Sequence, residues 1–273
     1  MIQLVFSDLD ETLLTPDHHV PLINRQAIAR AREKGVRLIP TTGRGYEMTT
    51  EILKEIGIYD KENEYVIAFN GGMIVECKDF REIRFSGLDF ETVKTLYEAG
   101  KEKDVCMEIF TPSCVYIFHA NDDEIKRKRK QKANFKVIEG DDLHFLKNER
   151  LAKIIFEKVD MPYLHSVAEE MKDLTQGKVE VSFSSGRYLE FNRLGVCKGE
   201  AIQWLSHYLK IPMARTMAIG DNENDLSMIK AAGIGVAVAS ALDVVKAEAD
   251  EITTIDFSDG AVAEMLEKHV LSK

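Results

Sequence analysis

Two aspartates stand one residue apart near the start of the chain, and they are the side chains best placed to do chemistry. Asp8 and Asp10 follow the apolar run 2–6, and Thr12 comes two residues later. Such a run is typical of a short buried strand, and a carboxylate at its end is costly unless positive charge compensates it. Ligands of open α/β sheets bind at the carboxyl ends of the strands. These residues therefore predict one half of a metal or phosphate site.

Three further polar clusters follow predicted strands or begin predicted helices. They are Thr41-Thr42-Gly43-Arg44, Gly195-Val196-Cys197-Lys198-Gly199 and Gly220-Asp221-Asn222-Glu223-Asn224-Asp225. Each cluster alone is weak evidence for a functional site. Asn222 can simply cap a helix, a Thr-Gly pair is an ordinary turn, and a lysine at a helix start is often solvated. In combination they are complementary, which favours a shared site.

The complementarity is one of charge and ligand type. The first aspartate pair and Asp221 offer hard oxygen ligands, which suit Mg²⁺. Thr42 and the backbone N–H of Gly43 offer neutral donors for phosphate oxygens, and Lys198 offers a positive charge for the same anion. All the clusters lie at carboxyl ends of predicted strands or one turn beyond, so one crevice can contain them.

The elements that must position these residues alternate between strand and helix at both ends of the chain. Before residue 70 we predict strands over 36–40 and 65–69 and helices over 22–34 and 46–56. After about residue 192 we predict helices over 198–209, 222–232, 241–248 and 260–269 and strands over 216–219 and 234–238. This order predicts a parallel α/β sheet.

The middle of the chain has a different pattern. Closely spaced strands are predicted over 81–85, 105–110, 114–119, 151–157, 179–183 and 188–191, with helices over 89–101 and 162–174. Such a run indicates an inserted α+β unit with an antiparallel sheet. The fold class predicted from the pattern is therefore an α/β core interrupted by a second domain.

Composition narrows the classes of partner. The chain has 273 residues and a formal net charge of −10, which disfavours general binding to nucleic acid or to an anionic membrane. No apolar run approaches the roughly 20 residues that span a bilayer. No signal-peptide pattern is present, and the four cysteines form no C-x-x-C pair. We therefore expect a cytoplasmic protein with reduced thiols and no nucleic-acid or membrane partner.

Two other polar features are expected to have no catalytic role. The basic run 126–132 follows acids at 122–124, so charge matched to the helix dipole predicts a solvated helix, with a basic patch for anionic substrates as the alternative. His18 and His19 lie in a predicted loop, where we expect them to be solvated, with a place at the mouth of the site as the alternative.

The four clusters, in this order, resemble the haloacid dehalogenase-like phosphatases, and within them the Cof-type sugar phosphatases. The resemblance covers essentially the whole chain and rests on Asp-x-Asp-x-Thr-Leu, Thr-Gly-Arg, Lys-Gly and Gly-Asp-x-x-Asn-Asp. It implies a Rossmann-like doubly wound, mostly parallel core at 1–82 and 189–273. It also implies an inserted α+β cap, which sets substrate specificity, at 83–188.

The resemblance also implies a role for each motif residue. Asp8 would be the nucleophile that forms an aspartyl-phosphate, and Asp10 the general acid and then the general base. Phosphate or substrate would be held by the residues Leu9 (backbone), Thr42, Gly43, Arg44, Lys198 and Asn224. The metal ion, Mg²⁺, would be held by Asp8, Asp221 and the backbone carbonyl of Asp10, with Asp225 in the second layer. Thr42 and Lys198 would also belong to the catalytic set.

Glu11 departs from the family pattern, because glycine is usual at that position. Glu11 adds a carboxylate beside the site and has less backbone freedom, so we expect altered rate or affinity rather than loss of activity. The implied activity is Mg²⁺-dependent hydrolysis of small phosphorylated metabolites, sugar phosphates being the subfamily's usual class. A phosphomutase or phosphotransferase, a phosphorylatable signalling receiver and an idle binding module remain alternatives.

Overall fold

The computed structural model describes residues 1–272, which divide into two compact units. One unit contains Met1–Arg84 together with the chain from Cys197 onward, and the other contains Phe85–Val196. The chain therefore returns to the first unit after Val196 rather than after residue 188. The reason is that β11 (Tyr188–Arg193) is hydrogen-bonded between two strands of the second unit.

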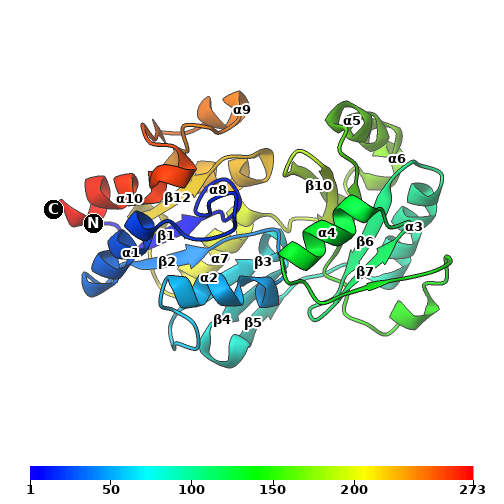
Figure 1. The fold of residues 1–273 in the computed structure, drawn as a ribbon, viewed down its shortest axis with the longest axis horizontal. Coiled ribbons are helices and arrows are strands. Elements are labelled where there is room, and N and C mark those ends of the chain that lie inside the picture. Colours follow the sequence, from blue (N-terminus) through cyan, green and yellow to red (C-terminus); the bar gives the residue numbers. More distant parts are fainter. Residues whose placement is uncertain (273) are drawn as a thin grey trace. The chain divides into compact units, whose positions relative to one another are not determined.

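The first unit is built on a five-stranded parallel sheet with the strand order β14-β13-β12-β1-β2 (Figure 1). Its strands are β1 (Leu4–Ser7), β2 (Arg37–Pro40), β12 (Thr216–Gly220), β13 (Ile234–Ala237) and β14 (Glu251–Ile252). The predicted α/β fold class is confirmed. The strand order places β1 between β2 and β12, so that segments far apart in sequence are neighbours in the sheet.

A three-stranded sheet accompanies the parallel one and consists of β3 (Tyr65–Ala68), β4 (Met73–Glu76) and β5 (Arg81–Phe85). We predicted β3 as a further parallel strand. It does meet the parallel sheet through one parallel bridge, Thr41 to Ile67, but its continuous pairing is antiparallel, with β4. The chain reverses after β3 because Asn70 and Gly71 both adopt positive φ, 55° and 104°.

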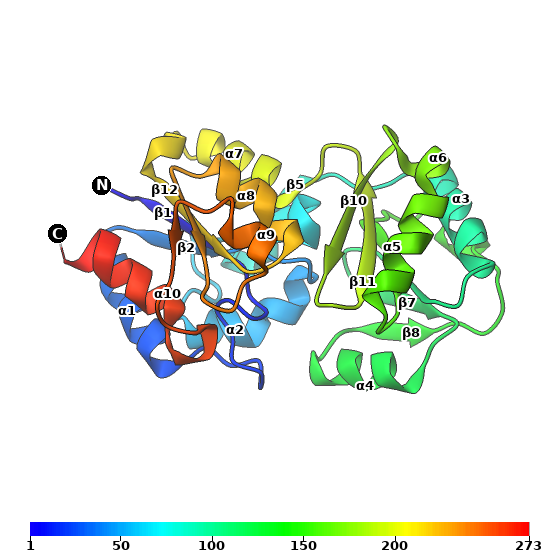
Figure 2. The same cartoon turned by 90° about the horizontal axis from the view of Figure 1, so that it is seen from above.

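Helices cover both faces of the parallel sheet. They are α1 (Leu22–Glu33), α2 (Thr50–Glu55), α7 (Lys198–Tyr208), α8 (Leu226–Ala231), α9 (Asp243–Lys246) and α10 (Ala261–Leu266). Figure 2 shows α7 and α8 on one side of the sheet and α1 and α10 on the other. On the α7 side, Leu4, Phe6 and Ile202 belong to one buried apolar cluster. Because helices lie on both sides, the side chains on both faces of the sheet are buried.

The second unit is a six-stranded sheet with the order β10-β11-β9-β6-β7-β8. Its strands are β6 (Cys106–Phe110), β7 (Val115–Phe118), β8 (Phe135–Val137), β9 (Lys153–Glu157), β10 (Val179–Ser184) and β11. Its helices are α3 (Phe90–Lys101), α4 (Asp122–Lys130), α5 (Met161–Glu170) and α6 (Lys172–Thr175). The pairing is antiparallel as predicted, except that β8 runs parallel to β7.

The two faces of this sheet differ in polarity. One face carries apolar residues such as Ile109, Phe156 and Leu189, which pack with residues of α3 and α5. The other face carries Glu108 and Lys153, both almost fully buried, and packs against α4. A buried polar side chain needs a polar partner, so this face depends on contacts between polar side chains rather than on apolar contact.

The basic helix α4 is therefore only partly solvated, which corrects our expectation for the run 126–132. Asn121 caps the helix, accepting from the N–H of Glu124 at 2.8 Å. However, Lys128 is buried, with its Nζ 2.7 Å from Glu108 and 3.0 Å from Glu124. The sequence pattern could not show this, because the partner carboxylate of Glu108 comes from a distant strand.

Two further expectations concern the chain as a whole. Within residues 1–272, no helix combines the length and the apolar character that crossing a bilayer requires. The four cysteines are all free thiols, and three of them, Cys77, Cys106 and Cys114, are buried.

Candidate active site

The carboxyl edge of the parallel sheet brings the predicted polar clusters together. Asp8 directly follows β1, and Asp221 directly follows β12, its hydrogen-bonded neighbour. The loop containing Thr42 follows β2 on the other side of β1. Because the three strands are parallel and adjacent, their carboxyl ends meet at the same edge. All the predicted site residues belong to the first unit.

Lys198 forms the centre of the charged network. Its Nζ donates hydrogen bonds to Asp8 Oδ1 and Asp225 Oδ1, both at 2.5 Å, and its side chain is fully buried. Burial by itself would lower the pKa of Lys198, but the carboxylates of Asp225 and Asp8 outweigh this effect and raise that pKa above its usual value. Lys198 is thus held as a cation beside Asp8.

Close packing of α7 against α8 delivers this lysine to the site. Gly199, the next residue of α7, lies so near α8 that a Cβ there would be 2.3 Å from the backbone oxygen of Ser227. The N–H of Gly199 donates to Ser227 Oγ at 3.0 Å. The glycine of the Lys-Gly motif is therefore required by a close backbone approach.

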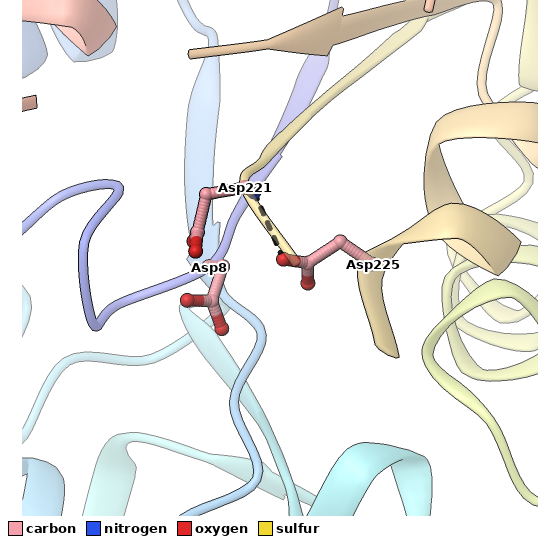
Figure 3. Close-up of side chains that lie close together, drawn as sticks. All are labelled: Asp8, Asp221 and Asp225. Atoms are coloured by element: carbon pink, nitrogen blue, oxygen red, sulfur yellow. Dashed lines mark hydrogen bonds between the residues drawn. The ribbon is translucent and has the colours of Figure 1, made fainter. Parts of the chain in front are cut away.

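Three carboxylates converge next to Lys198, as Figure 3 shows for Asp8, Asp221 and Asp225. One oxygen from each lies within 4.8 Å of the others, and all three residues are buried. Burial raises the pKa of Asp8 to about 7, against the opposing effect of Lys198. Burial and the neighbouring carboxylates of Asp225 and Asp8 also raise the pKa of Asp221 well above its usual value.

This balance of charge fits a divalent cation. Three acids face one buried ammonium group, so when all three are ionised they carry more negative charge than Lys198 neutralises. Carboxylate oxygens are the ligand type that Mg²⁺ prefers in proteins. Burial and the repulsion of neighbouring carboxylates raise the pKa values of Asp8 and Asp221, and a bound cation would relieve that repulsion.

Asp225 differs from the other two acids in how its oxygens are used. Its Oδ1 accepts from Lys198, and its Oδ2 accepts from the backbone N–H groups of Asp221 and Asn222 at 3.0 and 3.1 Å. It therefore closes the turn that presents Asp221 while orienting Lys198. Thr12 supports Asp221 from the other side, because its Oγ1 donates to Asp221 Oδ1 at 2.6 Å.

The Thr42–Arg44 loop is held in place at several points. The N–H of Thr42 donates to the carbonyl of Ile67 at 2.8 Å, and Thr42 Oγ1 accepts from the N–H of Arg44 at 3.1 Å. Phe69 N–H donates to the carbonyl of Arg44 at 3.0 Å. Gly43 lies between these anchors and is half-buried. These hydrogen bonds fix the backbone of the loop on both sides of Gly43.

Asp10 lies outside the three-carboxylate cluster, and its side chain is directed to Arg44. Arg44 Nε donates to Asp10 Oδ2 at 2.9 Å, and Arg44 Nη2 donates to Asp10 Oδ1. This is a bidentate pair, which fixes the orientation of the carboxylate as well as its charge. Arg44, predicted as a phosphate or substrate ligand, therefore has an additional partner within the site.

Two residues near the site were not predicted to belong to it. His18, expected in solvent, lies with its Nδ1 3.0 Å from Arg44 Nη2 and only 19% of its side chain exposed. Asn70, which begins a predicted turn and matches a minor signature of the resembled subfamily, accepts through Oδ1 from Asn224 Nδ2 at 3.3 Å. The N–H of Asn70 also donates to the carbonyl of Thr42 at 2.9 Å, so this residue links the Asn224 and Thr42 loops.

Comparison with known proteins agrees with this architecture. Residues 5–266 match the family model of haloacid dehalogenase-like hydrolases. The chain is 30% identical to YxeH of Bacillus subtilis over 282 residues, covering 100% of both chains. It is 28% identical to the 5-amino-6-(5-phospho-D-ribitylamino)uracil phosphatase YcsE of the same organism, covering 99% of this chain and 96% of YcsE.

A solved structure is similar over the same length. The crystal structure of a haloacid dehalogenase-like hydrolase from Bacteroides thetaiotaomicron superimposes with a TM-score of 0.84 and 28% identity. The alignment covers 98% of this chain and 99% of that one. From the family match over nearly the whole chain, this protein belongs to the haloacid dehalogenase-like hydrolases and is a phosphoric monoester hydrolase.

Proposed function

We propose that the protein is a Mg²⁺-dependent phosphatase that hydrolyses small phosphorylated metabolites, of the sugar-phosphate type, through an aspartyl-phosphate on Asp8. The observation that carries the proposal is the contact of Lys198 Nζ with both Asp8 and Asp225 inside a cluster of three buried carboxylates. A carboxylate is a poor nucleophile toward a phosphoryl dianion unless positive charge offsets the repulsion. A fully buried ammonium group beside Asp8 supplies part of that charge.

The remaining positive charge would come from a metal ion. Asp8, Asp221 and the backbone carbonyl of Asp10 would hold Mg²⁺, since both oxygens of Asp225 already accept hydrogen bonds. When bound there, Mg²⁺ supplies charge that offsets the phosphoryl oxygens and orients them for in-line attack. Asp225 would act through Lys198 and the turn at Asp221 rather than by direct contact.

The chain's own residues account for the proton transfers. In the first half-reaction a carboxylate oxygen of Asp8 forms a bond to phosphorus while the bond to the substrate oxygen breaks, and Asp10 gives its proton to that oxygen. In the second, Asp10 takes a proton from water as the water oxygen forms a bond to phosphorus; the bond between phosphorus and the Asp8 oxygen breaks, which releases inorganic phosphate and regenerates the Asp8 carboxylate. The Arg44 pair stabilises the carboxylate form of Asp10 that the second half requires. In the first half, one oxygen of Asp10 carries the proton while the other still accepts from Arg44, which keeps the carboxyl group in its plane.

The substrate class rests on similarity rather than on the site. YcsE, by its name, acts on a phosphorylated ribityl compound, which is a phosphate ester of a sugar alcohol. Thr42, Gly43, Arg44, Lys198 and Asn224 would hold only the phosphate group, and the family resemblance assigns the choice of the organic part to the inserted unit. We therefore place specificity in the inserted unit and expect phosphate esters of polyhydroxylated molecules to be the best substrates.

The decisive experiment follows phosphate release and the covalent intermediate together. The wild type should release phosphate from p-nitrophenyl phosphate with Mg²⁺ and stop when EDTA is added. Asp8→Asn should lower kcat at least about 10³-fold, because the amide cannot form the aspartyl-phosphate. Acid quenching and peptide mass spectrometry should place a phosphoryl group on Asp8 in the wild type. Full activity of Asp8→Asn would contradict the nucleophile assignment.

The same assay separates the alternatives. A phosphomutase or phosphotransferase would release little phosphate until an acceptor is supplied. A signalling receiver would accumulate the phosphorylated form without turnover. Asn224→Asp is a useful companion variant, because a carboxylate in place of the predicted phosphate ligand should raise KM more than it lowers kcat.

A further inference from the structure

The loop that follows β1 carries a histidine whose imidazole reaches the proposed acid and base. His18 Nδ1 lies 3.0 Å from Arg44 Nη2 and 3.5 Å from Asp10 Oδ1. Arg44 in turn donates through Nε and Nη2 to the two oxygens of Asp10. The three side chains therefore form one connected group in which the arginine is central.

The number of hydrogens on Arg44 Nη2 indicates the role of His18 in this contact. The guanidinium group has no acceptor, and Nη2 carries two hydrogens. One of them completes the fork on Asp10, which leaves the second for His18. If Nδ1 also carried a hydrogen, two donors would face each other at 3.0 Å. We assign Nδ1 as the acceptor of this contact, with the imidazole hydrogen on Nε2; a hydrogen on Nδ1 would instead have to point to Asp10 Oδ1, 3.5 Å away.

The backbone around His18 is ordered by its own contacts. The N–H of His18 donates to the carbonyl of Thr15 at 2.8 Å, and the N–H of Thr15 donates to the carbonyl of His19 at 2.9 Å. Glu55, at the end of α2, accepts from the N–H of Val20 at 2.7 Å and lies 2.6 Å from His19 Nδ1. His18 itself has φ of +62°, a conformation that side chains seldom adopt. The turn thus presents the imidazole in a defined direction.

We propose that His18 is a positioning residue: its Nδ1 anchors Arg44, and Arg44 so anchored sets the orientation of the Asp10 carboxylate. The inference rests on the proposed function of Asp10 and extends it to a residue outside the motifs. Without the acceptor, the second Nη2 hydrogen loses its partner and the guanidinium group can turn away from the plane of Asp10. The proton on Asp10 would then be poorly aimed at the leaving oxygen.

Two substitutions of His18 distinguish the effect of losing the acceptor from the effect of changing the backbone conformation. His18→Asn keeps an acceptor close to the place of Nδ1 and tolerates positive φ, whereas His18→Gly tolerates the same φ without any acceptor. His19→Gly is the matched control, because it alters the same turn at a residue that contacts Glu55 and not Arg44. Each variant is assayed with Mg²⁺ on p-nitrophenyl phosphate and on β-glycerol phosphate.

The two substrates differ in how much they need a proton. p-Nitrophenolate leaves readily without one, whereas an alkoxide must be protonated as it leaves. His18→Gly should therefore lower kcat/KM for β-glycerol phosphate about tenfold more than for p-nitrophenyl phosphate. His18→Asn and His19→Gly should change the ratio between the substrates less than about twofold. An equal loss on both substrates in His18→Gly would indicate a merely structural role and overturn the proposal.

A second measurement does not depend on activity. Two-bond ¹H–¹⁵N spectra near pH ~8, where an ordinary imidazole is neutral, report which ring nitrogen carries the hydrogen. The His18 signal, assigned by its loss in His18→Asn, should show Nε2–H with Nδ1 as acceptor and should shift in Arg44→Lys. A hydrogen on Nδ1 would overturn the proposal. A wild type that releases no phosphate would instead contradict the proposed function, while the spectrum still decides the contact.

Discussion

At the scale of single residues, the site depends on a few side chains that each serve two neighbours. Lys198 serves Asp8 and Asp225, and Arg44 serves Asp10 and His18. Because each contact fixes the orientation of the next side chain, the loss of one residue is expected to affect more than its own function. Glu11 is the exception, since it is exposed and lies at the edge of this network.

Glu11 occupies a backbone conformation that favours glycine, with φ of +58°. A residue with a Cβ is strained in this left-handed region of the backbone. Replacing Glu11 with glycine should relieve the strain and increase the free energy of unfolding by about 1 kcal/mol. Glu11→Ala, which removes the carboxylate but keeps a Cβ, should show no such gain. Urea denaturation of the wild type and both variants measures the difference. Equal stability of the glycine and alanine variants would show that charge, and not φ, is the cost at this position.

At the scale of elements, the polar face of the second sheet and the helix α4 depend on each other. Glu108 and Lys128 are both nearly fully buried, and each side chain has the other as its main charged neighbour. Burial raises the pKa of Glu108 to about 8, although Lys128 opposes the shift. A helix that is basic in sequence is thus held by acids from β6 and from its own first turn.

This burial predicts a pH dependence of stability. The carboxyl group of Glu108 has a higher pKa in the folded protein than in the unfolded chain, so the folded state binds more protons between these values. Its contribution to stability is therefore complete below pH ~4.5 and is lost as the pH rises to about 8, by at most about 1.4 kcal/mol per pH unit. Glu108→Gln should reduce this loss, measured as urea midpoints from pH 5 to 9.

A matched control isolates the effect of Glu108 from those of the other acids. Glu169→Gln removes a carboxyl group from an exposed position of α5 and should leave the pH profile of the wild type unchanged. Asp8 and Asp221 contribute a dependence of the same sign in all three proteins, so it cancels in the comparison. Parallel profiles of wild type and Glu108→Gln would mean that Lys128 keeps Glu108 charged throughout this range.

At the scale of the whole molecule, the proposed chemistry and the proposed specificity are divided between two compact units. Every motif residue lies in the first unit, which is made of two separate stretches of the chain. The second unit has its own sheet and its own apolar cluster, formed with α3 and α5. A metal ion at the three-carboxylate cluster is therefore expected to stabilise the first unit in particular.

The single tryptophan of the chain, Trp204, lies on α7 and reports on the first unit. Saturating Mg²⁺, at about 100 times its dissociation constant, should raise the free energy of unfolding followed by tryptophan fluorescence by about 2.7 kcal/mol. Asp221→Asn should abolish most of this gain, because it removes a proposed ligand. The absence of a Mg²⁺-dependent shift in the wild type, or an equal shift in the variant, would contradict the metal site.

The sequence by itself determined which residues stand at the ends of which strands. Asp8, Asp221 and the Thr42 loop could be placed at the carboxyl ends of neighbouring strands, because apolar runs indicate strands and helices and a following glycine indicates where a helix ends. Tertiary structure decided what these residues touch. The pairing of Asp10 with Arg44 and His18, the burial of Lys128 against Glu108 and the reversal of β4 onto β3 all depend on packing.

The physical reason is the range of the interactions. Helix and strand preferences act over a few residues, so they are visible in the order of residue types along the chain. A contact such as that between Lys198 and Asp8 joins residues 190 positions apart and exists only once α7 is packed beside β1. The same holds for the Asp8-Leu9-Asp10 segment itself: the chain supplies the two carboxylates, and only the fold gives one to Lys198 and the other to Arg44.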